Sequence, residues 1–202
     1  MLDKYHHGDL RAAVLAAAAE VIARDGVDKL SLRSLAMELG VSHTAPRHHF
    51  GDREGVFTAL ATQGYELLAD ALEDAAANGD FAAVGVAYVM FAVNHAGHFA
   101  VMHRRDLVDG SSADLQRARA RTTAQLNAGA RTHGSKSLEG VAVASIAAWS
   151  LVHGLATLQL SGELQAAGLL QQAGRDLPSI ALRAVQQLFG GAPSESTTRT
   201  EN

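Results

Sequence analysis

The chain of 202 residues contains no cysteine, only three prolines and a single tryptophan. Without cysteine it can form no disulfide, no thiolate metal site and no cysteine nucleophile. Alternating β-branched runs are also absent, so helical periodicity is the recurring pattern. We find no apolar run of the roughly 18–20 residues that a membrane helix needs, and the first ten residues, MLDKYHHGDL, hold no apolar signal core. We therefore expect an all-α cytoplasmic protein without a membrane segment.

The sequence also has no excess of positive charge. The net charge is −4, and residues 1–60 carry seven Lys or Arg against eight Asp or Glu. A protein that coats nucleic acid through bulk charge is therefore disfavoured, and any DNA contact must depend on the local geometry of a motif. In other respects the composition, 48% hydrophobic and 19% charged, is that of an ordinary globular protein.

Capping residues divide the helical pattern into segments. We expect the first four helices over residues 8–24, 31–39, 43–50 and 52–77, and an apolar helix that Asp80 opens and a break near Ala96-Gly97 ends. Further helices are predicted from 112 to 134, 138 to 160, 163 to 174 and 177 to 189, with a disordered tail at 191–202. Ser31, Ser42 and Asp52 are good N-caps because each side chain can accept a free amide of the first turn.

Residues 31–50 have the spacing of a helix-turn-helix. Two short helices are joined by Gly40 and Val41 and follow a longer one. The second short helix leaves four side chains with little reason to be buried: His43, Thr44, Arg47 and His48. An exposed helix with such donors suits the major groove of DNA, where side chains reach base edges. From spacing alone, ordinary packing of a helical hairpin explains the pattern equally well.

Particular residues add to this interpretation. Ser31-Leu32-Arg33, Gly40-Val41-Ser42, His49-Phe50 and Asp52-Arg53-Glu54 together resemble the DNA-binding domain of the tetracycline-repressor (TetR) family. The resemblance covers roughly residues 5–65. YHHGDLRAAV at 5–14 and SHTAP at 42–46 are similar to one large branch of the family, and Trp149, His153 and Gly154 resemble the Trp-His-Gly signature of that branch's C-terminal domain.

The resemblance implies a homodimer with a three-helix DNA-binding domain at 1–60 and an effector-binding and dimerisation domain at 61–190, linked by the helix over 52–77. It also implies a non-enzymatic, ligand-responsive regulator without a cofactor, most simply a repressor that a small organic effector releases from a near-palindromic DNA operator. The candidate DNA-binding residues are Ser31, Arg33, Ser42, His43, Thr44, Arg47, His48 and Arg53. Arg47 stands where the family usually has an aromatic residue, and His48 where the branch commonly has Arg, so operator preference cannot be carried over.

An apolar segment with embedded histidines, residues 82–102, is a candidate wall of an effector pocket. Trp149 and His153 are four residues apart and share a helix face that could complete it. The candidate pocket residues are Tyr88, Phe91, His95, Phe99, Met102, Trp149 and His153. Plain core packing explains such residues too. A largely apolar lining favours an uncharged or weakly anionic effector. We expect the dimer interface on 138–160 and 177–189.

Two other functions remain open at this stage. His95, His98 and His153 could make the protein a metal-responsive regulator, although no carboxylate lies at a ligand spacing beside them. Ser150 near His153 could indicate a helical enzyme or carrier, but there is no positioned acid and no glycine-rich nucleophile turn, so we assign no catalytic residue. Activation of transcription, in place of repression, also fits the sequence.

Overall fold

The computed structural model describes residues 7–78, 80–132 and 137–189, and the regular elements in these ranges are all helical, which confirms the all-α prediction. The predicted tail, and Gly79 and Gly134 as helix ends, lie outside the described residues. The N-terminal helices are α1 (His7–Asp25), α2 (Leu32–Glu38), α3 (Ala45–Phe50) and α4 (Arg53–Asn78). The others are α5 (Phe81–Asn94), α6 (Ala96–Met102), α7 (Ala113–Thr132), α8 (Leu138–Leu160), α9 (Glu163–Ala166), α10 (Leu169–Ala173) and α11 (Leu177–Phe189).

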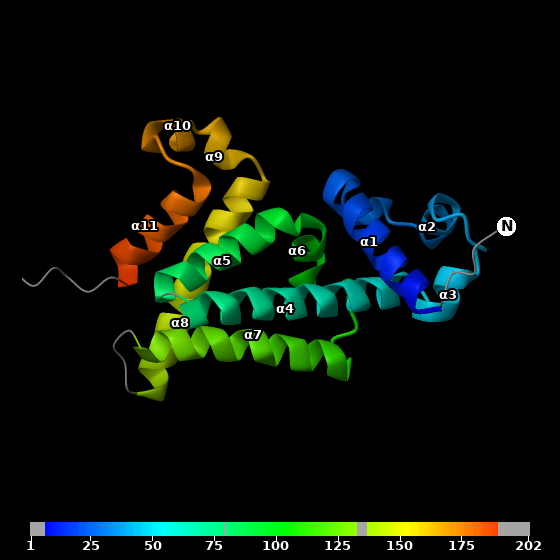
Figure 1. Ribbon diagram of the computed structural model, residues 1–202, viewed down its shortest axis with the longest axis horizontal. Helices are drawn as coiled ribbons and strands as arrows, with labels where there is room; N and C mark the ends of the chain where they lie inside the picture. The colour runs from blue at the N-terminus through cyan, green and yellow to red at the C-terminus, as the bar shows by residue number, and fades with distance from the viewer. Residues whose placement is uncertain (1–6, 79, 133–136, 190–202) are drawn as a thin grey trace, which may run out of the picture.

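Helices α1 to α3 form a small head at one end of the long α4 (Figure 1). Ser31 caps α2 by accepting the amide of Ser34 at 3.4 Å. Gly40 has φ +64°, and the amide of Val41 donates to the carbonyl of Ala36 at 3.0 Å. This bond spans a left-handed glycine, so the turn after α2 is closed as the sequence predicts.

The helix predicted at 43–50 begins two residues later, at Ala45. Pro46 is the reason, because a residue without an amide proton is tolerated only in the first turn of a helix. Ser42 tightens the preceding turn: its hydroxyl accepts the amide of Thr44 at 3.4 Å and bonds the Thr44 hydroxyl at 2.8 Å. Asp52 caps α4 by accepting the amide of Gly55 at 2.9 Å.

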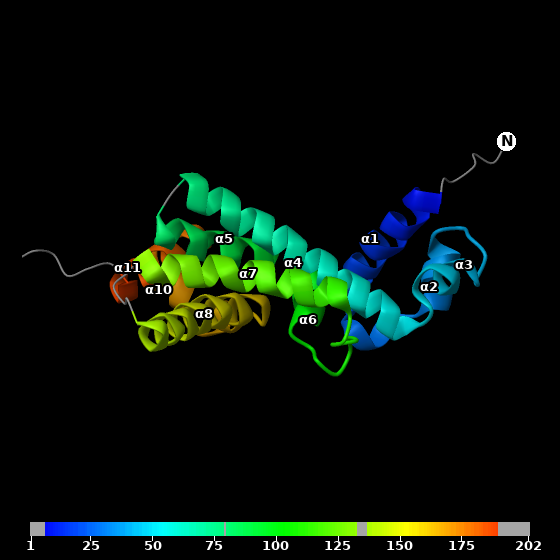
Figure 2. The ribbon, with the colours of Figure 1, turned by 90° about the horizontal axis from the view of Figure 1, so that it is seen from below.

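The body of the protein is built on α4, which packs against α5, α6 and α7, while α8 lies beside α7 and α5 (Figure 2). One continuous apolar core runs from α1 through α4 to α5 and α8, and includes Val14, Leu60 and Val89. The chain turns by 103° between α5 and α6, at His95, directly before the predicted break.

The predicted helix over 163–174 is two short helices, α9 and α10. Gly168 separates them with φ +67°, a left-handed conformation that interrupts a right-handed helix. A glycine inside an otherwise helical pattern permits this conformation but does not require it, so the sequence alone did not locate the break.

The sequence has no uninterrupted apolar run of the length that a membrane helix needs, yet α8 is apolar along most of its length. This helix is long and apolar enough to span one by length and composition, and the bent pair α5–α6 passes the same test. Only 28% of the most apolar part of α8 is buried within the monomer. Leu138, Val143 and Ile146 are 80%, 61% and 62% exposed, so this helix presents an uncovered apolar face.

Candidate DNA-binding face and ligand cavity

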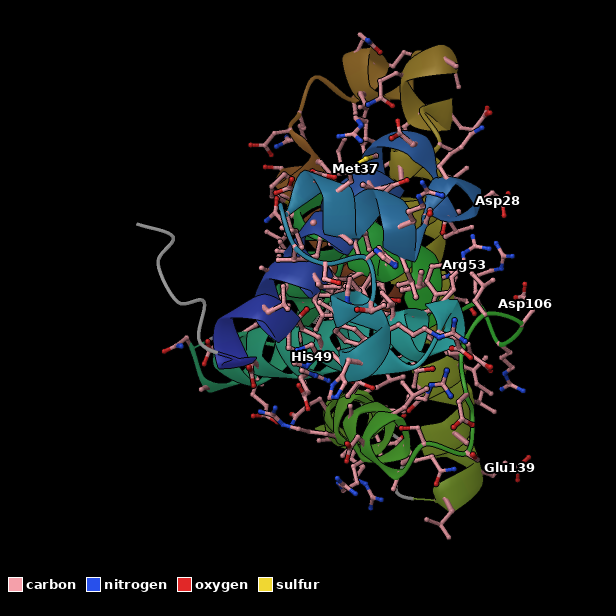
Figure 3. All side chains as sticks on the ribbon, turned by 90° about the vertical axis from the view of Figure 1, so that its right-hand side faces the viewer. Asp28, Met37, His49, Arg53, Asp106 and Glu139 are labelled. Carbon is pink, nitrogen blue, oxygen red and sulfur yellow. The ribbon has the colours of Figure 1, made fainter. Side chains whose placement is uncertain are left out.

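Helices α2 and α3 form the outer end of the head, the end that faces the viewer in Figure 3. The hydroxyl groups of Ser31, Ser42 and Thr44 lie on this exposed surface, together with the side chains of Arg33, His43, Arg47 and His48. All seven are candidate DNA-binding residues, and the structure brings them onto one end of the molecule. Met37, 76% exposed on α2, lies there too (Figure 3).

Arg47 and His48 face outward because the residues on either side of them in α3 are used for packing. Pro46 is buried, and Phe50 packs against the core with the guanidinium of Arg11 5.5 Å from its ring centre. Neither Arg33 nor Arg47 forms an ion pair within the described part of the chain. Their guanidinium groups are therefore free of carboxylate partners on a surface that could meet phosphates or guanine edges.

Arg53 has a different environment from the other candidates. Its guanidinium donates to the carbonyl of Val27 and lies 4.9 Å from the ring centre of Phe57. It is only partly exposed. Arg53 thus ties the beginning of α4 to the turn that follows α1, a structural role that the sequence did not predict.

A cavity of about 740 Å³ lies in the C-terminal body, among α4, α5, α7, α8, α11 and the end of α6. This volume lies in the range of small-molecule sites. Five aromatic side chains contribute to its lining: Tyr65, Phe81, Tyr88, Trp149 and Phe189. Helix α7 contributes four polar residues to the lining: Arg119, Thr122, Thr123 and Asn127.

Four of the predicted pocket residues line this cavity: Tyr88, Met102, Trp149 and His153. Phe91, His95 and Phe99 do not. Phe91 stacks on His95 with ring centres 5.0 Å apart, and Phe99 is buried behind the wall, 5.3 Å from the ring centre of His153. The bend at His95 turns α6 away from the axis of α5, so these aromatic residues pack between helices.

Tyr88, Trp149 and His153 are joined by hydrogen bonds. The indole N–H of Trp149 donates to the Tyr88 hydroxyl at 3.2 Å, and that hydroxyl lies 3.0 Å from Nδ1 of His153. Since the Tyr88 oxygen already accepts a hydrogen bond from Trp149, its own hydroxyl hydrogen can be donated to Nδ1 of His153. Burial lowers the pKa of His153, and the neutral imidazole in this arrangement carries its proton on Nε2.

Sequence reasoning missed Tyr65, His103, Arg105 and Arg119 as lining residues. Burial, followed by the nearby His153 and Arg119, lowers the pKa of His103 to about 4. Its Nδ1 lies 3.5 Å from the Tyr65 hydroxyl, while its Nε2 is buried without a hydrogen-bond partner. The spacing of Arg119, Thr122 and Leu126 along α7 marks one helix face and was the available signal for this wall.

The three histidines of the metal hypothesis do not come together. His98 bonds Gln63 of α4 at 3.0 Å, whereas His153 bonds Tyr88 across the cavity. Burial, and then the neighbouring His95, lowers the pKa of His98 to about 4. In residues 7–78, 80–132 and 137–189 no three His, Asp or Glu side chains are grouped closely enough to hold an ion.

Comparison with known proteins identifies the family. Residues 14–60 match the tetR family of bacterial regulatory proteins, and residues 81–177 match the tetracyclin repressor-like C-terminal domain. The chain belongs to the TetR family. TetR proteins are DNA-binding transcriptional regulators and not enzymes, and the N-terminal match covers most of the head.

Solved structures share the whole fold. A protein of unknown function from Rhodococcus sp. RHA1 is 32% identical, with 94% of this chain and 98% of that chain covered and a TM-score of 0.73. The TetR regulator PfmR from Thermus thermophilus is 20% identical over 89% of this chain and 98% of its own, with a TM-score of 0.65.

NalD, the secondary repressor of the MexAB-OprM multidrug efflux pump in Pseudomonas aeruginosa, is 20% identical over 95% of this chain and 100% of its own (TM-score 0.53). At these identities PfmR and NalD show the shared fold alone. No curated protein matches the chain.

Proposed function

We propose that this TetR regulator is a cytoplasmic repressor that a small organic effector, bound in the cavity, releases from its operator without a cofactor. One observation carries the proposal. Met102 and His103, at the end of α6, line the cavity, while Gly97, near the beginning of the same helix, touches α1 of the DNA-binding head. A ligand that displaces the end of α6 therefore acts on a helix in direct contact with the head.

Helix α4 supplies a second connection. Tyr65, Leu68 and Leu72 of α4 line the cavity, and Arg53 at its other end holds the turn after α1. Helices α4 and α6 are also bonded to each other through Gln63 and His98. Two packed helices thus link cavity and head, which is the kind of contiguous element that can shift between two arrangements.

In the bound state, α3 would enter the major groove with Arg47 and His48 toward the DNA. Arg33 and the hydroxyl groups of Ser31, Ser42 and Thr44 would reach phosphates on either side. Arg47, as an unpaired guanidinium, can bind guanine through two parallel hydrogen bonds, a contact worth about 1–3 kcal/mol of base discrimination.

The uncovered apolar face of α8 would be the centre of a homodimer interface. Val143, Ile146 and Leu158 are exposed on this helix, and Leu188 is 64% exposed at the end of α11. Ala181 and Val185 of α11 are buried against the body, so only part of this helix is available to a partner. Two-fold symmetry would place operator half-sites about 34 Å, or a multiple of that distance, apart.

Selection of operators from random DNA by the purified protein, followed by a screen for small molecules that dissociate the selected complex, tests the proposal. We expect a near-palindromic sequence and at least one organic ligand that lowers its affinity about 5–150-fold, the range of a typical coupling energy. Failure to enrich any sequence would overturn operator binding. A ligand that strengthens the complex would indicate co-repression or activation in place of induction.

A further inference from the structure

The charged side chains on the cavity wall are of one sign. Arg105 and Arg119 contribute to the lining, and no Asp or Glu does so among the described residues. Arg119 is half-buried, with its guanidinium carbon 5.4 Å from the ring centre of Tyr65. An arginine facing a mainly apolar cavity without a carboxylate is an electrostatic site for an anion.

Neighbouring arginines show that this lack of pairing is selective. Arg104 pairs with Asp106 at 2.7 Å, Arg117 pairs with Asp114, and Arg121 pairs with Asp70 at 2.7 Å and with Glu73. These carboxylates lie outside the cavity lining. In the part of the chain that the structure describes, Arg105 and Arg119 take part in none of the ion pairs. The cavity wall therefore keeps two positive charges without a carboxylate partner, one on the half-buried Arg119 and one on the exposed Arg105.

The imidazole of His103, beside these arginines, is neutral near pH 7. It therefore leaves their positive charge unchanged. The low pKa of His103, about 4, has burial as its main cause and the positive charge of Arg119 as a smaller one. A cationic ligand would be repelled here, whereas an anion would find the donors of two guanidinium groups. The hydroxyl groups of Thr122 and Thr123 already donate to backbone carbonyls.

The two ends of the cavity differ in polarity. Arg119, Tyr65 and His103 lie at one end. Gly129, ten residues farther along α7, lies against the ring of Phe81, which in turn contacts the ring of Phe189 at a centre distance of 5.6 Å. At 1.5 Å per residue this is about 15 Å from the charged end. The distant end is lined by Leu72, Phe81, Val84 and Phe189.

We propose that the cavity binds an amphipathic organic carboxylate, with its carboxylate on Arg119 and Arg105 and its apolar body directed toward Phe81 and Phe189. The proposal rests on the ligand-responsive function above and names the class of its effector. A carboxylate suits the site better than a phosphate ester, because a dianion loses more hydration on burial and needs more donors than two arginines offer.

Trp149 lines the cavity and is the sole tryptophan, so its fluorescence reports ligand binding without DNA. Three probes with the same ten-carbon chain separate charge from apolar burial: decanoate, 1-decanol and decylammonium, all below their micelle concentrations at pH 7.5. We expect decanoate to bind at least tenfold more tightly than 1-decanol, and decylammonium to bind least. Equal affinity for decanoate and 1-decanol, or no response to decanoate, would overturn the proposal.

Arg119→Gln should remove the preference for decanoate while 1-decanol still binds, and Arg105→Gln should weaken it in part. Arg117→Gln is the matched control on the same helix, since Arg117 is exposed and paired with Asp114 outside the lining, and it should keep the preference. A preference unchanged in both the Arg119 and Arg105 variants would overturn the assignment.

The proposed class of ligand and the proposed regulatory function can be refuted independently of each other. If decanoate binds but does not dissociate a selected operator, the carboxylate site stands and induction by this ligand is refuted. If an uncharged or cationic molecule dissociates the operator while decanoate is rejected, the regulatory function stands and the carboxylate site is refuted.

Discussion

Gly97 of α6 lies so close to α1 that a Cβ atom at this position would be 2.0 Å from the carbonyl oxygen of Ala19. Real Cβ atoms essentially never approach a backbone oxygen at this distance, so only glycine allows the two helices to touch in this way. The contact joins the helix that ends in the cavity wall to the first helix of the DNA-binding head.

Gly97→Ala should separate α6 from α1. Alanine favours a helix over glycine by about 1 kcal/mol, yet the clash with backbone should outweigh this gain and lower the free energy of unfolding by about 1–3 kcal/mol. Urea unfolding measures the change. Gly110→Ala is the control, because nothing lies within 4 Å of a Cβ at Gly110. Equal stability of the two variants would contradict a tight α1–α6 contact.

Arg47→Ala should weaken binding to a selected operator by about 10–100-fold, because an exposed guanidinium on α3 is lost. Fluorescence anisotropy on the operator and on single-base variants measures this. If Arg47 reads a base, the variant also loses discrimination at one position of each half-site; if it contacts phosphate, affinity falls equally for all sequences and the salt dependence becomes shallower. Unchanged operator affinity would remove Arg47 from the DNA-binding face.

Val143→Glu should dissociate the proposed homodimer, because a carboxylate on the apolar face of α8 would be buried without a partner. Analytical ultracentrifugation should show monomers that keep their helical circular dichroism and bind the full operator far more weakly. Ala120→Glu, at an exposed position of α7, should leave the dimer intact. Dimers of unchanged affinity in the Val143 variant would place the interface on another surface.

Stability should fall as the pH drops from about 6.5 to 4. In the unfolded chain a histidine titrates near 6.5, whereas burial lowers the pKa values of His98 and His103 to about 4 in the folded protein. Between these values the unfolded chain binds more protons, so each histidine lowers the free energy of unfolding by at most about 1.4 kcal/mol per pH unit. Well above pH 6.5 both are neutral in either state and the contribution is fully present.

Urea unfolding at pH 7.5, 5.5 and 4.5 measures this decline. The double variant His98→Gln, His103→Gln cannot take up these protons and should show a shallower decline, while His43→Gln, at an exposed position, should follow the original chain. An equally steep decline in the double variant would assign the acid sensitivity to other groups.

Local signals in the sequence predicted most of the helices and the arrangement of the head. Ser31, Asp52 and Asp80 cap the helices that they were expected to cap, because a cap depends on atoms within one turn. The start of α3 was predicted too early, because Ser42 is a good N-cap for a helix that begins at 43. The helix begins instead where Pro46 falls in its first turn.

The cavity was harder to predict because its walls come from segments far apart in the chain. Aromatic residues at helical spacing gave Tyr88, Trp149 and His153, but could not show that the bend at His95 packs Phe91 and Phe99 elsewhere. Arg119 was visible only as one arginine in a polar helix, and its lack of a carboxylate partner depends on the positions of Asp70, Glu73 and Asp114. Arg53 likewise matches a family motif, while its bond to Val27 is a tertiary contact.

The most direct test measures both halves of the coupling on one operator and one releasing ligand. Operator affinity is titrated with and without saturating ligand, and ligand affinity is followed through Trp149 with and without saturating operator. The account predicts that the ligand weakens operator binding, and that the operator weakens ligand binding by the same factor. A ligand that occupies the cavity and leaves operator affinity unchanged would contradict it.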